Sequence, residues 1–136
     1  MIGSLDITSS ALAAQRARMD VIAGNMANAF STHRDDGTPE PYRRRYVVFE
    51  PGTVASGVGV RVEGVYEDVS DYPLRHDPAH PDAIADGPLR GYVRMPNVNI
   101  TLEYVDALEA ARAYEANLAM MNLSRGMIQS ALRLFA

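Results

Sequence analysis

One short segment of this sequence combines residue types that bind metal ions or carry out acid–base chemistry. Residues 76–82 contain two histidines and two aspartates, and imidazole and carboxylate groups are common zinc ligands. His76 and His80 are four residues apart, the spacing that places two histidines on one face of a helix in zincin-type sites. Pro78 and Pro81 disfavour a regular helix here. We therefore expect a solvated loop capped by its own aspartates, with no metal and no cofactor.

A basic run is the second candidate for chemistry. Arg43, Arg44 and Arg45 are flanked by Tyr42 and Tyr46, a pattern that could bind single-stranded nucleic acid through charge and stacking. The net charge of −4, however, gives the chain no general attraction for phosphates. We interpret the run as the basic end of a strand that pairs with acidic groups on a neighbouring subunit, and we expect no nucleic-acid partner.

Enzymatic arrangements are not indicated. The 17 carboxylates and three histidines guarantee some proximity, but a catalytic triad is recognised by its geometry. No glycine-rich loop stands between a strand and a helix in the order that a phosphate-binding loop needs. The chain lacks cysteine, which excludes thiolate metal sites and disulfides. We expect neither an enzyme nor a small-molecule substrate.

The helix-breaking residues are confined to the middle of the chain. All eight prolines lie between Pro39 and Pro96, so the two ends can form long helices and the middle cannot. No stretch approaches the roughly 20 consecutive apolar residues of a membrane span. The first residues lack a basic region followed by an apolar one, so we expect no cleaved signal peptide and no membrane-spanning segment.

The first end, residues 1–30, carries a helical trace of apolar residues. Alternating steps of four and three residues place these on one face of a helix. We expect this face to form an assembly interface, made by Leu5, Leu12, Met19, Ile22 and Met26.

The second end, residues 97–136, carries a longer trace of the same kind. Its helix is expected to begin at Asn97 or Asn99, since asparagine is a good N-cap. The sustained spacing favours coiled-coil-like packing. We expect an interface made by Ile100, Tyr104, Ala107, Ala111, Tyr114, Leu118, Met121, Arg125, Ile128, Leu132 and Phe135. Arg125 is the one charged member, so it should find a carboxylate partner or place its guanidinium at the edge of the interface.

The middle is predicted to contain a linker loop, residues 31–45, and a small β module, residues 46–96. Tyr46–Glu50 is rich in β-branched and aromatic residues, Val58, Val60 and Val62 alternate with other residues, and Gly91–Met95 resembles a third strand. The alternation changes phase near Gly64, which predicts a bulge. Residues 70–90 are expected to be mostly loop. The fold class is therefore α+β, with a small antiparallel β module inserted between two long terminal helices.

Several segments resemble one known family. Residues 14–28, from Ala14 to Asn28, resemble the N-terminal signature of flagellar rod, hook and hook-junction proteins. Residues 91–99 and 112–117 resemble the C-type subunit of the proximal rod, as do residues 41–44 and 77–82. The similarity spans nearly the whole chain, in the same order.

This resemblance implies a structural subunit of the bacterial flagellar basal-body rod, which polymerises through its terminal helices and transmits torque. Its implied partners are other rod proteins, copies of itself and the flagellar type III export apparatus. Its implied location is the periplasmic part of the basal body. A cytoplasmic coiled-coil adaptor and a small ligand-binding domain are the alternatives that the residues leave open.

The two apolar stripes also bear on folding. A helix of this length with a bare apolar stripe is marginal in water, because most helical stability in proteins comes from packing. We therefore expect the ends of the isolated chain to be largely unfolded, and to fold when neighbouring subunits cover them.

Overall fold

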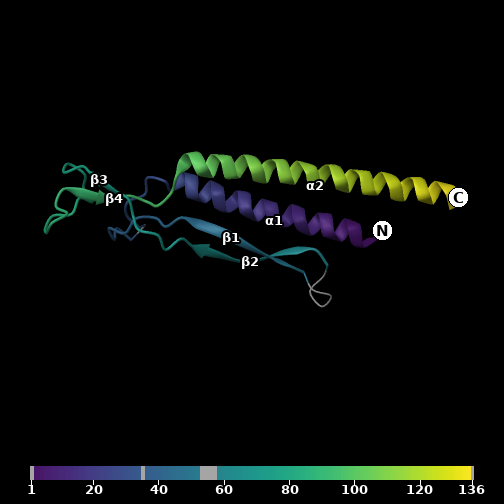
Figure 1. Ribbon diagram of the computed structural model, residues 1–136, viewed down its shortest axis with the longest axis horizontal. Helices are drawn as coiled ribbons and strands as arrows, with labels where there is room; N and C mark the ends of the chain where they lie inside the picture. The colour runs from purple at the N-terminus through teal and green to yellow at the C-terminus, as the bar shows by residue number, and fades with distance from the viewer. Residues whose placement is uncertain (1, 35, 53–57, 136) are drawn as a thin grey trace.

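Two long helices and two small sheets make up the part of the chain that the computed structural model describes, residues 2–34, 36–52 and 58–135 (Figure 1). The side chains of Ile2 and Phe135 lie outside that description. In chain order the elements are α1 (Ile2–Ala27), β1 (Arg45–Pro51), β2 (Val60–Glu67), β3 (Leu74–His76), β4 (Tyr92–Arg94) and α2 (Ile100–Phe135). The predicted α+β class, with antiparallel strands inserted between terminal helices, is confirmed.

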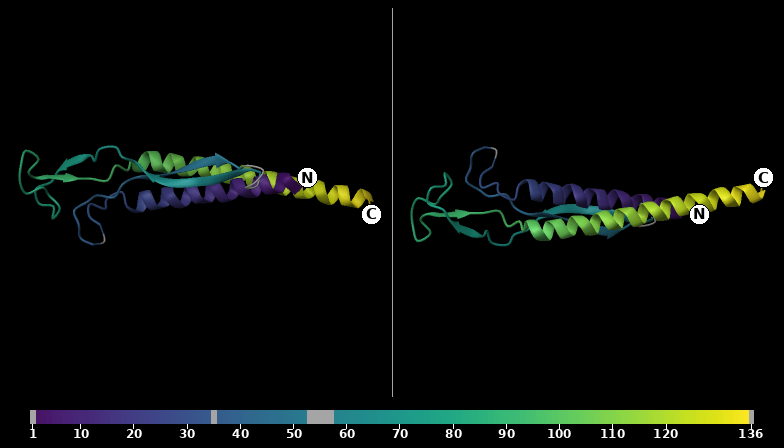
Figure 2. Two further views of the ribbon diagram at one scale, coloured as in Figure 1. Left: turned by 90° about the horizontal axis from the view of Figure 1, so that it is seen from below. Right: turned by 90° about the horizontal axis from the view of Figure 1, so that it is seen from above.

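The helices lie side by side and antiparallel, and β1 and β2 run along α1 and pack against it (Figures 1 and 2). The end of α1 meets the start of α2, as the hydrogen bond between Asn25 and Glu103 shows. Because α2 has 36 residues and α1 has 26, the last ten or so residues of α2 extend past the start of α1. We call this projecting stretch, residues 125–135, the overhang.

The start of α2 is set by one asparagine. The Asn99 Oδ1 accepts hydrogen bonds from the backbone N–H groups of Thr101 and Leu102, at 3.0 and 3.3 Å. This is N-cap geometry, so Asn99 is the cap among the two predicted candidates. The side chain of Asn97 has a different role: its Oδ1 accepts from the backbone N–H of Arg44 at 2.7 Å and so ties the linker to the start of α2.

The β1–β2 hairpin has an irregular register. Val48 faces Gly64, but the next residue, Phe49, faces Val62, so Glu63 is left over. This is the predicted bulge near Gly64. The start of β2 is tied to α1, because the Ser10 Oγ accepts a hydrogen bond from the Val60 N–H at 3.1 Å.

Gly59 is required for that approach. Its φ of +135° lies in a region that L-residues avoid, and a Cβ at this position would collide with the Ser10 Oγ. The hairpin can therefore reach α1 only with glycine at position 59.

The second sheet contains a strand that was not predicted. Residues 70–90 are mostly loop, as expected, but the three-residue strand β3 forms within them and pairs antiparallel with β4, with Arg75 opposite Val93. The sequence of β3 is too short and too close to proline to show a strand pattern. Its pairing comes from the later strand: the Met95 N–H donates to the Pro73 carbonyl at 2.8 Å, and Val93 is fully buried. The expected single β module is thus two separate two-stranded sheets.

The buried row of α2 is rotated slightly from the predicted stripe. The side chains that are at least half-buried at heptad spacing are Glu103, Ala107, Ala110, Tyr114, Asn117, Met121, Ser124, Ile128 and Ala131. Alternate members of this row coincide with the predicted stripe, and the others lie one residue earlier. Small and polar residues occupy those earlier positions. A prediction based on hydrophobicity alone therefore does not select them.

Candidate functional site

A buried polar junction lies where the last turn of α1, the start of β1 and the first turns of α2 meet. Asn25 and Glu103 are its centre, and both side chains are fully buried. Buried polar groups are costly unless they are hydrogen-bonded, so this junction is stable only if every partner is in place.

Asn25 satisfies all of its hydrogen-bonding capacity. Its amide donates to the Arg45 carbonyl at 2.7 Å and to the Glu103 carboxylate at 3.0 Å. Its carbonyl oxygen accepts from the Arg45 N–H at 2.9 Å and from the Tyr42 hydroxyl at 3.1 Å. With respect to Arg45, the Asn25 side chain therefore acts as a neighbouring strand would, and fixes the start of β1 against α1.

Two arginines neutralise the acids of α2 at this junction. The Arg44 Nε donates to the buried Glu103 carboxylate at 2.5 Å, and its terminal nitrogen lies 3.3 Å from Asp106. Arg18, on α1, lies 3.6 Å from Asp106 and 3.6 Å from Glu109. The charge of Glu103 is thus compensated by a charged partner, as a buried carboxylate requires.

The structure corrects our interpretation of the basic run. We expected it to pair with acids of a neighbouring subunit, but its partners lie in the same chain. Arg43 donates to the carbonyls of Asp68 and Ser70 at 3.3 Å and stacks on Tyr72, with its guanidinium carbon 4.4 Å from the ring centroid. Arg45 lies 3.4 Å from Glu67. In the folded chain the run therefore holds the linker against α2 and the hairpin.

The histidine-containing loop, residues 76–82, is held by hydrogen bonds. The His80 Nδ1 accepts from the Asp82 N–H at 3.1 Å, and the Asp82 carboxylate accepts from the Thr32 hydroxyl at 2.5 Å. That hydrogen bond lowers the pKa of Asp82, with a further contribution from His33 at 3.2 Å. His76 packs edge-on against Tyr92. The described residues contain no group of three or more histidine or carboxylate side chains placed to hold a metal.

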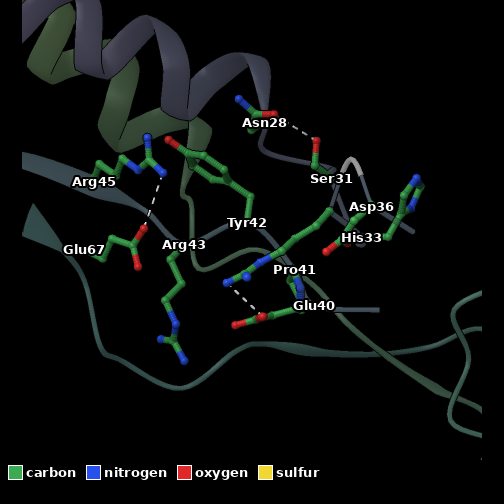
Figure 3. A pocket seen from close by; sticks show the side chains of 11 residues that line it. Asn28, Ser31, His33, Asp36, Glu40, Pro41, Tyr42, Arg43, Arg45 and Glu67 are labelled. Atoms are coloured by element: carbon green, nitrogen blue, oxygen red, sulfur yellow. Dashed lines mark hydrogen bonds and ion pairs between the residues drawn. The ribbon is translucent and has the colours of Figure 1, made fainter. Parts of the chain in front are cut away.

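A pocket of about 530 Å³ opens between the linker and the hairpin (Figure 3). Its charged side chains are engaged with other protein groups. Figure 3 draws the pair of Arg45 with Glu67. Arg34 also pairs with Glu40, at 2.9 Å. Asp36 accepts from the Thr38 N–H, which lowers the pKa of Asp36. The pocket therefore offers no converging set of uncommitted groups for a ligand.

The predicted interface residues of α1 are partly covered by the chain itself. Ile22 is buried, and the other four predicted members, Leu5, Leu12, Met19 and Met26, are half-buried. They are covered because α1 packs against α2 and also against both strands of the hairpin.

The predicted interface residues of α2 divide into two groups. Those that are half-buried are Ala107, Ala111, Tyr114, Met121 and Ile128. Those that are exposed are Ile100, Tyr104, Leu118, Arg125 and Leu132. The side chain of Phe135 lies outside the description. Exposed Arg125 has no ion-pair partner among the described residues, so within one chain its guanidinium is simply solvated.

The junction itself was missed by our sequence analysis, which assigned no role to Asn25. One signal was available in the sequence. Asn25 is a polar residue beside Ile22 and Met26, two members of the apolar stripe, and it lies inside the segment that carries the family resemblance. A buried asparagine must find hydrogen-bond partners and an exposed one need not, but burial can be seen only in the folded structure.

The two ends of the chain match the models of two protein families. Residues 5–34 match "Flagella basal body rod protein", and residues 89–134 match "Flagellar basal body rod FlgEFG protein C-terminal". Asn25 lies in the first matched segment and Glu103 in the second, so the junction joins the two.

Characterised relatives are similar over almost their full length. The flagellar basal-body rod protein FlgC of Borreliella burgdorferi is 41% identical, covering 97% of this chain and 95% of the relative. The FlgC protein of Bacillus subtilis is 40% identical, covering 96% and 95%. The FlgC protein of Salmonella typhimurium is 39% identical, covering 98% and 97%. Within the described residues, no helix has the length and apolar character needed to cross a membrane.

Proposed function

Since this chain belongs to the flagellar basal-body rod protein family, as a structural subunit of the rod, we propose that it polymerises through the exposed faces of its terminal helices. Torque then passes from subunit to subunit through packed helices, and no reaction is involved. The chain is not an enzyme on this proposal: its relatives are structural rod proteins, and the charged groups of the pocket between the linker and the hairpin are engaged with other protein groups.

The observation that carries the proposal is the exposed apolar surface of α2. Leu123 and Met127, at 59% and 56% exposed, line an open groove with the small residues Gly126, Ser130 and Ala131. Tyr104, Leu118 and Leu132 are exposed on other sides of the same helix. Exposed apolar side chains that line a groove are typical of protein contact surfaces, and small residues in a groove allow a helix to approach closely.

We assign the predicted interface residues to two kinds of contact. The half-buried ones, such as Tyr114 and Met121, hold α1 and α2 together within the subunit. The exposed ones, Ile100, Tyr104, Leu118, Arg125 and Leu132, face neighbouring subunits. Burying one leucine in such a contact stabilises it by about 1.5–3 kcal/mol.

The partners we propose are other rod proteins and copies of this chain. We further propose that the chain crosses the inner membrane through the flagellar type III export apparatus, without a cleaved signal peptide, and assembles in the periplasmic part of the basal body. The family membership supports the assembly with rod proteins.

A charge on the exposed helix face tests the proposal. Leu118→Asp should leave the subunit folded and soluble, because Leu118 is 42% exposed, but should prevent rod assembly in a strain that lacks the wild-type chain. Leu89→Asp is the matched control, since Leu89 is 39% exposed and lies outside the helices. Motility should be lost with the first variant and kept with the second. A motile Leu118→Asp strain would show that this face is not a contact surface.

A further inference from the structure

The charges of α2 are segregated along its length. Its first part, residues 100–115, contains four acids and one arginine: Glu103, Asp106, Glu109, Glu115 and Arg112. Its remainder contains two arginines, Arg125 and Arg133, and no acid. The helix therefore has an acidic end at the junction and a basic end at the overhang.

Only part of this charge is neutralised within the chain. Glu103 and Asp106 pair with arginines at the junction, and Glu109 makes one exposed contact with Arg18 at 3.6 Å. Glu115, Arg125 and Arg133 are exposed and have no ion-pair partner among the described residues. The two arginines lie in the overhang, the part of α2 that extends past the start of α1 (Figure 1).

We propose that the overhang of one subunit docks against the acidic first half of α2 of a second copy of this chain, with the two α2 helices parallel and staggered. This contact rests on the proposed function, because copies in a rod share one direction. It is a head-to-tail contact, the kind that leaves a free site at each end and so builds an open filament.

One stagger satisfies both pairs of charges. Arg125 is 16 residues after Glu109, and Arg133 is 18 residues after Glu115. At 1.5 Å per residue these separations are about 24 and 27 Å, a difference that flexible arginine side chains can absorb. A second copy displaced by roughly 25 Å along the helix axis therefore brings Arg125 near Glu109 and Arg133 near Glu115.

The faces also correspond. Around the helix axis, Glu109 and Glu115 are about 120° apart, and Arg112 lies midway between them. Arg125 and Arg133 are about 80° apart, and Gln129 lies midway between those two. When these faces meet in parallel helices, Arg125 falls on the side of Glu109 and Arg133 on the side of Glu115. Arg112 then faces Gln129, whose amide oxygen can accept its hydrogen bond.

Exposed apolar groups complete the contact. Val105 and Leu108 lie on the face bracketed by the acids, and Leu118 lies on the face bracketed by the arginines. Their burial excludes water from the ion pairs, which makes the pairs less sensitive to salt than fully exposed ones. The charges set the stagger and the direction of the second copy, and the apolar groups supply the contact area.

Charge reversal with rescue tests the proposal. The Arg125→Glu/Arg133→Glu variant and the Glu109→Arg/Glu115→Arg variant should each reduce the yield of rod-containing basal bodies by about tenfold or more, because like charges then face each other between copies. The variant that carries all four changes should recover most of the yield, since complementarity is restored. A four-fold variant that is no better than the two double variants would overturn the proposal.

Cross-linking gives a second measurement, which does not depend on yield. The chain has no cysteine, so a disulfide between copies of a Glu109→Cys/Arg125→Cys variant can join only the two introduced positions. Oxidation of purified basal bodies should give covalent dimers and longer ladders of this chain, whereas Leu102→Cys/Arg125→Cys, with a different stagger, should not. Equal cross-linking of both pairs, or none with the first, would overturn the proposal. The proposed function fails separately if the wild-type chain is absent from purified basal bodies.

Discussion

Removal of the Asn25 side chain is the most direct test of the buried junction. In Asn25→Ala the Glu103 carboxylate loses a hydrogen bond inside a fully buried site, and the backbone of Arg45 loses two. A hydrogen bond to a buried charge contributes about 1.5–3 kcal/mol and each neutral one about 1 kcal/mol. Tyr42 loses its acceptor as well, but it is only half-buried and can rehydrate.

The sum predicts a loss of about 3–5 kcal/mol in the free energy of unfolding, a large fraction of the stability of a domain of this size. Urea unfolding of the isolated chain, followed by circular dichroism at the helix band, measures it. Asn28→Ala is the matched control, because Asn28 directly follows α1 and its side chain makes only local hydrogen bonds: it donates to the Gly24 carbonyl at 2.9 Å and accepts from the Ser31 hydroxyl at 3.2 Å. We expect the control to cost about 0.5–1 kcal/mol.

A double variant separates the junction from a general packing defect. Asn25→Ala and Glu103→Ala remove the two ends of one hydrogen bond, so the combined loss should be smaller than the sum of the single losses by about 1–3 kcal/mol. Additive losses, or an Asn25→Ala variant as stable as Asn28→Ala, would refute the reasoning.

Two further predictions follow from the packing of the helices and the loop. Hydrogen exchange on the monomeric chain should be slow around Asn25 and Glu103, where α1 is covered by α2 and the hairpin, and fast in the overhang, 125–135. Uniformly fast exchange through both helices would instead support the sequence-based expectation that the ends fold only on assembly. The hydrogen bond from Thr32 lowers the pKa of Asp82 below its ordinary 3.8, so this contact stabilises the fold above the pKa of the unfolded residue and is lost as the pH falls through the lower folded pKa. An NMR titration of the Asp82 carboxyl should show its pKa move back up in Thr32→Val, and an unchanged pKa would contradict the assignment.

Much of the fold could be predicted from local patterns. Pro39 to Pro96 bound the region where helices cannot run, and β1 and β4 have the β-branched and aromatic residues of short strands. The bulge at Gly64 was visible as a change of phase along the strand, because side-chain alternation is a local property. The family followed from residues 14–28 and 91–99, whose order and composition are specific.

Other features depended on which elements meet. Strand β3 has three residues next to Pro73, too few to show a period, and it exists because β4 pairs with it. The covered row of α2 differs from the predicted stripe at every second position. Ala110, Asn117 and Ser124 are covered there, where the stripe predicted the residue that follows each of them. An alanine or serine is chosen there for close approach of the helices, which hydrophobicity does not measure.

The sequence by itself determined that this protein has two long terminal helices, that its middle is short strands and loops, and that it resembles rod subunits, since periodicity, proline and motif order are all local. Only the tertiary structure decided which face of α2 is covered, that Asn25, Arg44 and Glu103 form one buried junction, and that Arg125 stays in solvent. Those outcomes depend on contacts between residues up to 78 positions apart. Burial and hydrogen-bond partners are properties of the assembled elements, so no window along the chain contains them.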